Sequence, residues 1–396
     1  MNRMGTKVLF EIPYGMRDFL PKEAAAKRAV EQGISELFAR WGYEEVVTPT
    51  IEYLDTLAMG SGRVLEPHMF KLQGRDNRML ALRHEMTTPI ARLAASRLQG
   101  CPLPLKLSYV SSVFRYEQAQ AGRRCEFHQA GVELMGEGGA AADAEVIALA
   151  VECLRASGLE NFSICLGQVD FAQGIMEQNH ISETVQQDLK AAMERHDLVG
   201  LEAQVEALGL PEHTASALKE IPLLHGGKDM LERAYGLALN EQSRRALDNL
   251  SEIYRLLGHY GAADCVSFDL GMIRDFNYYT GMVFEIYSPG LGFPLCGGGR
   301  YDRMLSDFGM ACPATGFALG IDRILLALER QSLKQPGGHR DIYLGYGPTK
   351  AAEAIGKAME LRRQGMSVEL ALASQTRETA EESRRQKGYE RLVYLE

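Results

Sequence analysis

The feature that most limits the possible folds is a block of helical sequence that separates two groups of strand-like segments. Residues 172–260 are rich in Leu, Ala, Glu and Lys and space their apolar residues as helices do. Strand-like patterns lie before this block, at residues 81–135 and 162–166, and after it, at residues 266–270 and 282–287. This order predicts one largely antiparallel sheet built from distant segments, with a helical insertion at about residues 172–262.

The two ends of the chain predict further parts. Apolar residues recur at helical spacing over residues 22–40, and Gly42 follows them, which predicts a long amphipathic helix. The next segment, EEVVTPTIEYL, predicts a short strand that Pro49 interrupts, because proline cannot donate a hydrogen bond to a sheet. After a predicted linker at residues 336–338 come a strand in DIYLGYG, a helix at residues 350–364, a strand in VELAL and a last strand at residues 391–395. We therefore expect one domain over residues 1–330 and a small α/β domain over residues 340–396.

Composition excludes several classes of protein. The 396 residues include 52 acidic and 43 basic side chains, and the net charge of -9 leaves no general basic field to grip a nucleic-acid backbone. The seven cysteines form no C-x-x-C pair and have no histidine at metal spacing, so we expect reduced thiols and no metal site. No phosphate-binding G-x-x-x-x-G-K-[ST] loop is present, and we expect no cofactor. Neither a signal-peptide pattern nor an apolar run of ~20 residues occurs, which predicts a soluble, cytoplasmic protein without a membrane partner.

The segment FRYEQAQAGRRCEFHQAGVELMG, residues 114–136, concentrates charge around a glycine-containing loop. Arg115, Arg123 and Arg124 carry planar guanidinium groups suited to phosphates or carboxylates. Gln129 and Glu133 alternate along the strand that follows and share one of its faces. A binding hairpin is one interpretation. The other is a surface hairpin with solvated charges, since surface ion pairs contribute little stability.

Two other features are ambiguous when taken alone. The glycine-rich CGGGRYDR at residues 296–303 indicates little by itself, because ordinary tight turns and close backbone packing also use glycine. The nine histidines are scattered, and we expect His128, beside Phe127, to be a packed or surface residue rather than a catalytic one.

Joined to other segments, the charged hairpin resembles the histidyl-tRNA synthetase family, from about residue 12 to the end of the chain. The matching segments in chain order are IPYGMRDFLP (12–21), the strand at Pro49 as class II motif 1, LRHEMTTPIAR (82–92), the hairpin as motif 2, MIRDFNYYTGMVFE (272–285) followed by CGGGRYDRM, and GFALGIDRIL (316–325) as motif 3. The resemblance implies an α+β fold, with a class II aminoacyl-tRNA synthetase-like antiparallel sheet flanked by helices, and a homodimer formed through motif 1.

The resemblance also implies a pocket. The residues that match groups at the amino end of histidine are Glu85, Thr87 and Gln129, and those that match groups around its imidazole are Glu133, Tyr279 and Tyr301. Arg274 matches the arginine at the carboxylate and α-phosphate. The residues that match ATP contacts are Arg115, Glu117, Arg123 and Arg323. The residue types suit the ligand, since a zwitterion needs both signs of charge, and an acid with phenols can address both nitrogens of an imidazole.

Four positions depart from the synthetase pattern. Tyr14 replaces an arginine, His84 and Met86 stand where proline and glycine are usual, and Asn277 replaces an aspartate. The C-terminal domain is also expected to be truncated, because the chain ends at Glu396 before a final strand and helix. With these departures and its excess of acidic over basic residues, the sequence resembles the synthetase paralogues that serve as regulatory subunits of ATP phosphoribosyltransferase in histidine biosynthesis. That resemblance implies a non-catalytic subunit with a vestigial ATP site, a short-form catalytic phosphoribosyltransferase as its partner, and histidine as a possible effector.

Two alternatives from other classes stay open. An active histidyl-tRNA synthetase with a shortened C-terminal domain is supported by Arg115, Arg274 and Arg323. An RNA-binding or translational sensor module would need a basic face on the C-terminal domain, where acidic residues at 378, 381 and 382 dilute the basic residues at 384, 385 and 387. We therefore do not expect tRNA as a partner.

Overall fold

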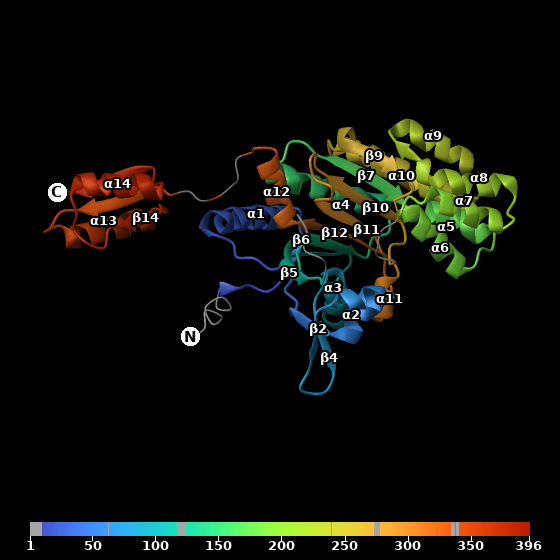
Figure 1. Ribbon diagram of the computed structural model, residues 1–396, viewed down its shortest axis with the longest axis horizontal. Coiled ribbons are helices and arrows are strands. Elements are labelled where there is room, and N and C mark those ends of the chain that lie inside the picture. The colour runs from blue at the N-terminus through green and yellow to red at the C-terminus, as the bar shows by residue number, and fades with distance from the viewer. Residues whose placement is uncertain are drawn as a thin grey trace, which may run out of the picture. The chain divides into compact units, whose positions relative to one another are not determined.

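The computed structural model of the protein describes residues 10–61, 63–116, 124–238, 240–272, 278–333, 337 and 340–396. The chain divides into a large unit that ends near residue 336 and a small unit that begins near residue 337 (Figure 1). Within the described ranges, no helix has both the length and the apolar content needed to cross a bilayer.

The large unit is built on one sheet that joins distant segments. In the described part of the chain this sheet has nine strands in the order β1-β5-β6-β12-β11-β10-β7-β9-β8, and its neighbours are antiparallel except for β1 with β5 and β7 with β9. The strands are β1 Glu44–Glu45, β5 Leu105–Phe114, β6 Glu126–Met135, β7 Ser163–Gln168, β8 His225–Gly226, β9 Val266–Asp269, β10 Met282–Tyr287, β11 Cys296–Arg300 and β12 Ala314–Gly320. The predicted antiparallel sheet is confirmed, and β7, from before the helical block, lies between β9 and β10, from after it (Figure 1).

Helices cover this sheet and bury its apolar side chains. The flanking helices are α1 Pro21–Arg40, α4 Ala140–Ala156, α11 Met304–Asp307 and α12 Ile321–Arg330. Helix α4 packs against β6, β11 and β12 and also against α10, which explains why 11 of its 17 residues are buried. The predicted helix at residues 22–40 is confirmed as α1. It ends before Gly42, whose φ of +81° is a conformation that favours glycine.

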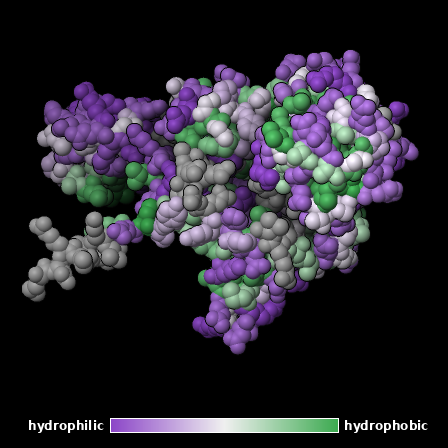
Figure 2. Space-filling model, turned by 45° about the vertical axis from the view of Figure 1, so that its right-hand side comes forward, coloured by the Kyte–Doolittle hydropathy of each residue, from purple (hydrophilic) through white to green (hydrophobic). Residues whose placement is uncertain are grey.

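The insertion consists mainly of helices. They are α5 Val169–Gln178, α6 Glu183–Glu194, α7 Leu198–Ala207, α8 Glu212–Glu220, α9 Lys228–Leu237 and α10 Glu241–His259, with single turns η4 Ile221–Leu223 and η5 Ala263–Cys265. Helix α10 contacts α5 and α9 on one side and α4 and β7 on the other, so it joins the insertion to the core. The prediction of helix throughout is wrong at β8, where two residues pair with β9 at the edge of the sheet. The face of the insertion in Figure 2 is largely hydrophilic, with apolar patches between.

A second sheet, of three antiparallel strands, precedes the site. It has the order β2-β4-β3, with β2 Ile51–Tyr53, β3 Lys71–Gln73 and β4 Met79–Leu82, and it is accompanied by α2 Leu54–Ser61 and η2 Arg63–His68. The predicted interruption at Pro49 is confirmed, because β1 and β2 on its two sides belong to different sheets. Helix α3 Thr87–Leu93 follows this sheet in the chain and continues as the π-helical turn η3 Ala94–Leu98.

The small unit is a parallel sheet with two helices. Its elements are β13 Ile342–Tyr346, α13 Ala351–Arg363, β14 Val368–Leu370, α14 Arg377–Lys387 and β15 Arg391–Leu395, with the strands in the order β14-β13-β15. The three predicted strands and the first helix are confirmed. Helix α14 is absent from the sequence prediction because RETAEESRRQK is almost wholly polar and buries just Ala380. Its signals are local: the Thr376 hydroxyl accepts from the Thr379 N–H over 3.3 Å, and Gly388 follows at a φ of +71°.

Candidate functional site

The predicted site centres on Glu133, in the middle of the large sheet. Glu133 lies on β6 between Leu107 of β5 and Gly316 of β12, and it is 1% exposed. Gly316 makes room for it, because a Cβ at that position would lie 2.2 Å from Glu133 Oε2. The interpretation of the hairpin as a solvated surface is therefore wrong for Glu133, which the two neighbouring strands bury.

Two hydroxyl groups hold the Glu133 carboxyl. Thr87 Oγ1 donates to Oε1 over 2.8 Å, and the Tyr301 hydroxyl donates to Oε2. Burial raises the pKa of Glu133 to about 8, the two hydrogen bonds oppose this rise, and nearby Glu85 adds to it. A carboxyl with this pKa exchanges a proton near neutral pH, where an imidazole does the same.

Glu85 lies just before α3 and caps that helix. Its carboxylate accepts the Thr88 backbone N–H, which lies 2.9 Å from one oxygen and 3.2 Å from the other. Burial raises the pKa of Glu85, and hydrogen bonds from Thr88 and Thr87 oppose the rise. The cap orients the segment that carries Thr87, and the Thr87 hydroxyl joins this segment to Glu133.

Three tyrosines form the aromatic side of the site. Tyr279 lies against Gly299 of β11, where a Cβ would be 2.8 Å from the tyrosine ring. Tyr278 contacts both predicted tyrosines, since its ring centroid is 4.7 Å from that of Tyr279 and 5.9 Å, edge-on, from that of Tyr301. Tyr278 is missing from the predicted residues, although the tyrosine pair in NYYTG was a sequence signal for it. At Gly299, the glycine therefore allows close packing, one of the ordinary uses of glycine considered for CGGGRYDR.

Two side chains, Gln129 and His84, have buried polar atoms without a hydrogen-bond partner among the described residues. Gln129 lies on β6 four residues before Glu133, and its Oε1 is one such atom. Both ring nitrogens of His84 also have no hydrogen-bond partner among the described residues. Burial, together with the charge of Arg115, lowers the pKa of His84 to about 3, so its ring is neutral. Because buried polar atoms are usually paired, a ligand that donates to Gln129 would complete its hydrogen bonding.

Two of the four residues predicted for ATP, Arg115 and Arg323, donate to backbone carbonyl groups. Arg115 Nε donates to the carbonyl oxygen of His84 over 2.9 Å, and its guanidinium lies 5.3 Å from the ring centroid of Phe127. Arg323 donates through Nη1 to the carbonyl oxygen of Pro294 over 2.6 Å, and its guanidinium lies 5.1 Å from the Phe293 ring. Of the remaining predicted or departing positions, Glu117, Arg123, Arg274 and Asn277 lie outside the described residues. Tyr14 is exposed and Met86 is buried.

His128 is packed, as expected. Its ring lies edge-on to Phe19 at 5.6 Å between centroids, and its Nδ1 lies 3.3 Å from Asp322 Oδ2. The same carboxylate oxygen accepts the backbone N–H of His128 over 2.9 Å. These contacts join β6 to the start of α12.

A cavity of about 410 Å³ borders the tyrosines on the side of the insertion. Tyr278 and Tyr279 belong to its core wall, and Gln173 of α5 and Lys190 of α6 belong to its insertion wall. Lys190 Nζ donates to Gln173 Oε1 over 2.6 Å, and burial lowers the pKa of Lys190. The volume is in the range of small-molecule sites, so the insertion and the tyrosines together enclose space for a polar ligand group.

Comparison with known proteins relates the chain to two kinds of protein with one fold. The family pattern described as Histidyl-tRNA synthetase matches residues 15–324. The ATP phosphoribosyltransferase regulatory subunit of Moorella thermoacetica is 45% identical over 378 residues, which are 95% of this chain and 96% of that protein. A crystal structure from Bacillus halodurans, described as an ATP phosphoribosyltransferase regulatory subunit/histidyl-tRNA synthetase, has a TM-score of 0.86 at 37% identity and covers 98% of this chain and 99% of its own. The histidyl-tRNA synthetase of a Nostoc species has a TM-score of 0.82 at 20% identity, covers 97% of this chain and 91% of its own, and shares the fold.

Proposed function

The chain belongs to the family of histidyl-tRNA synthetase-like ATP phosphoribosyltransferase regulatory subunits, and we propose that it serves a short-form catalytic phosphoribosyltransferase as a non-catalytic subunit. The observation that carries this proposal is the match to a regulatory subunit over nearly the whole length of both chains. The partnership places the protein at the first step of histidine biosynthesis, in the cytoplasm.

The pocket around Glu133 binds histidine as a feedback effector. The imidazole lies against Glu133, Tyr279 and Tyr301, and the α-amino group donates to Glu85 and Gln129. The buried carboxyl supports this assignment, because its pKa of about 8 and that of an imidazole, about 6.5, bracket neutral pH, so one proton can be shared between them. The unpartnered Gln129 Oε1 also supports it. The assignment of Arg274 to the ligand carboxylate rests on the resemblance to the synthetase family alone.

The lack of catalysis is supported by the backbone partners of Arg115 and Arg323. The competing function, an active synthetase with a shortened C-terminal domain, requires the purified chain to charge tRNA with histidine. We expect neither aminoacylation nor phosphoribosyl transfer from the isolated chain. Robust charging of tRNA in a standard aminoacylation assay would overturn the proposal.

The chain also pairs with a second copy of itself through the motif 1 region, residues 22–54. Symmetric pairing is the commonest form of assembly, and Val47 and Ile51 in this region are 80% and 46% exposed. Sedimentation at micromolar concentration checks this, and a monomer there would contradict it.

Copurification with the short-form phosphoribosyltransferase of the same genome tests the whole assignment. We expect a hetero-oligomer whose transferase activity requires both chains and is inhibited by histidine. Complexes that carry Glu133→Gln or Arg274→Ala should form and remain active but lose inhibition. Full, histidine-sensitive activity of the catalytic chain alone would remove the proposed role.

A further inference from the structure

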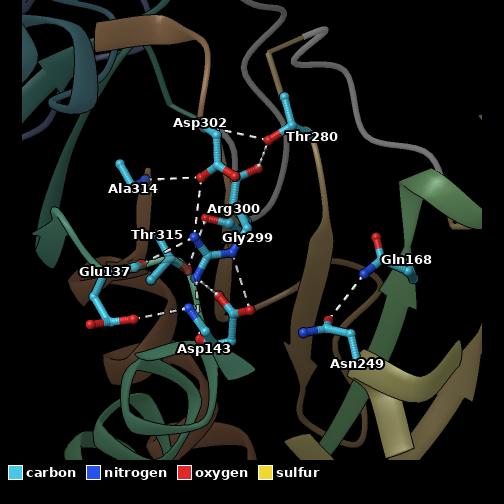
Figure 3. A network of polar contacts seen from close by, with 11 residues as sticks. Glu137, Asp143, Gln168, Asn249, Thr280, Gly299, Arg300, Asp302, Ala314 and Thr315 are labelled. Carbon is cyan, nitrogen blue, oxygen red and sulfur yellow. Dashed lines mark hydrogen bonds and ion pairs between the residues drawn. The ribbon is translucent and has the colours of Figure 1, made fainter. Parts of the chain in front are cut away.

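Arg300, the residue before Tyr301, forms a buried ion pair with Asp143. Arg300, the last residue of β11, donates to both carboxylate oxygens of Asp143 on α4, from Nε over 3.2 Å and from Nη2 over 2.8 Å (Figure 3). The guanidinium also donates through Nη1 to Asp302 Oδ1 over 3.1 Å and to the carbonyl oxygen of Glu137 over 3.2 Å. Arg300 is 6% exposed and Asp143 is fully buried. One guanidinium thus ties β11 to the start of α4.

The same network fixes the backbone on both sides of Tyr301. Asp302 Oδ1 also accepts the Ala314 N–H over 3.0 Å, and the Tyr301 N–H donates to the carbonyl oxygen of Ala314 over 2.8 Å. The Asp302 N–H donates to Thr280 Oγ1 over 2.9 Å, and the Thr280 N–H donates to the carbonyl oxygen of Arg300 over 2.8 Å. Thr280 directly follows Tyr278 and Tyr279 in the chain, so the network also anchors the backbone next to these two tyrosines. Figure 3 shows Thr280, Arg300 and Asp302 in this network.

Stability alone is a poor explanation for this ion pair. Removing two charges from water costs about as much as their attraction returns, and well-packed apolar residues of similar volume often replace a buried pair without loss. What apolar residues cannot supply is the direction of the guanidinium hydrogen bonds, which fix Asp302 and the start of α4 relative to β11. Tyr301, whose backbone this network fixes, donates its hydroxyl to Glu133.

We infer that Arg300 and Asp143 are positioning residues, which hold the Tyr301 hydroxyl on the Glu133 carboxyl and thereby set the selectivity of the pocket for an imidazole. The placement of Tyr301 is independent of any ligand. The selectivity rests on the proposed binding of histidine.

The test of placement uses the titration of Glu133, followed by ¹³C NMR of the full chain labelled at glutamate Cδ and assigned with Glu133→Gln. Tyr301→Phe sets the reference, because loss of the phenol removes a bond that lowers the pKa of Glu133 and therefore moves its midpoint upward. We expect Arg300→Met with Asp143→Leu to move the midpoint upward by at least half as much. Arg300→Lys, which keeps the charge but loses the fork, serves as a second variant and should move it in the same direction.

The matched control is the ion pair of Arg384 and Glu381 on α14 of the small unit. Arg384 donates to both carboxylate oxygens of Glu381, from Nε over 2.9 Å and from Nη2 over 2.8 Å, so this pair has the same fork geometry as that of Arg300 and Asp143. Arg384→Met with Glu381→Leu should leave the Glu133 midpoint where it is in the wild type. An unchanged midpoint in folded Arg300 variants, or an equal shift in the control, would overturn the positioning role.

Calorimetry on the complex with the catalytic subunit tests the selectivity. Both Arg300 variants should bind histidine about fivefold to tenfold more weakly, the loss of roughly one hydrogen bond, and should discriminate less between histidine and amino acids without a ring N–H. If the wild-type complex binds no histidine, the proposed function fails while the titration still decides the placement. Unchanged histidine affinity beside a shifted titration would overturn the selectivity and leave the placement intact.

Discussion

The two halves of the predicted pocket hold their charged groups in different ways. In the imidazole half, Glu133 is buried and bonded by the side chains of Thr87 and Tyr301. In the nucleotide half, Arg115 and Arg323 are half-buried and donate to backbone carbonyl groups beside aromatic rings. A buried carboxyl changes its protonation when its surroundings change, whereas an arginine on a carbonyl keeps both its charge and its partner. A ligand can therefore change the protonation of the buried carboxyl in the imidazole half, whereas the charge of the two arginines in the nucleotide half is fixed.

The largest expected effect is a pH-dependent stability that belongs to Glu133. The folded-state pKa, about 8, is above the ordinary value of 4.5, so the folded chain binds this proton more tightly than the unfolded chain does. The resulting stabilisation is complete below about pH 4.5 and is lost as the pH rises to about 8. Each tenfold change in proton affinity corresponds to about 1.4 kcal/mol, so the loss reaches up to roughly 5 kcal/mol.

Glu133→Gln isolates this effect, because other titrating groups contribute nearly equally to both proteins. Urea unfolding between pH 5 and pH 8.5 should show the free energy of unfolding of the wild type falling relative to that of the variant. If the difference in the free energy of unfolding between the two proteins stayed constant across this range, the pKa of Glu133 in the folded chain would not be raised.

The second expected effect is on histidine affinity. In the proposed histidine complex, Glu133 shares one proton with the imidazole. Glu133→Gln would then replace a charged hydrogen bond with a neutral one and should cost about 1.5 to 3 kcal/mol, or roughly 10-fold to 150-fold in Kd. Wild-type affinity should be nearly constant between the pKa of free imidazole, about 6.5, and that of Glu133, about 8. Above this range it should fall about tenfold per pH unit, because binding then requires proton uptake. Calorimetry from pH 6 to pH 9 measures both, and a variant with wild-type affinity would remove Glu133 from the pocket.

How far the sequence predicts this pocket depends on where each constraint comes from. Gln129 and Glu133 are on one strand, so their common face follows from a period of two residues. The burial of Glu133 depends on Gly316, which follows it by some 180 residues, and no local pattern indicates that β12 will lie beside β6. Tyr278 was missed because its role comes from packing between Tyr279 and Tyr301 rather than from its own spacing. The resemblance named the residues, whereas their hydrogen bonds and protonation required the fold.

The third expected effect is on stability and concerns the space that Gly316 leaves beside the Glu133 carboxyl. In Gly316→Ala the new Cβ would lie 2.2 Å from Glu133 Oε2 and 2.4 Å from the carbonyl oxygen of Val132, so the carboxyl and a central strand must shift. Overpacking of this kind typically costs about 1 to 3 kcal/mol in the free energy of unfolding. Gly356→Ala on α13, where a Cβ would meet nothing within 4 Å, is the control and should be neutral or slightly stabilising. Equal unfolding midpoints in urea for both variants would contradict the tight fit around Glu133.

The smallest expected effect comes from the nucleotide half. Arg115→Met and Arg323→Met each remove a guanidinium from a carbonyl group but leave the Thr87, Glu133 and Tyr301 hydrogen bonds in place. If these arginines no longer serve a phosphate, histidine affinity and feedback inhibition of the complex should change by less than about twofold, since the net value of one such bond is small and acts on the fold rather than on the ligand. An active synthetase predicts the opposite, because fixed positive charge at the phosphates contributes to the transition state of adenylation. Pyrophosphate exchange by the wild type that either variant abolishes would show that both halves still work together.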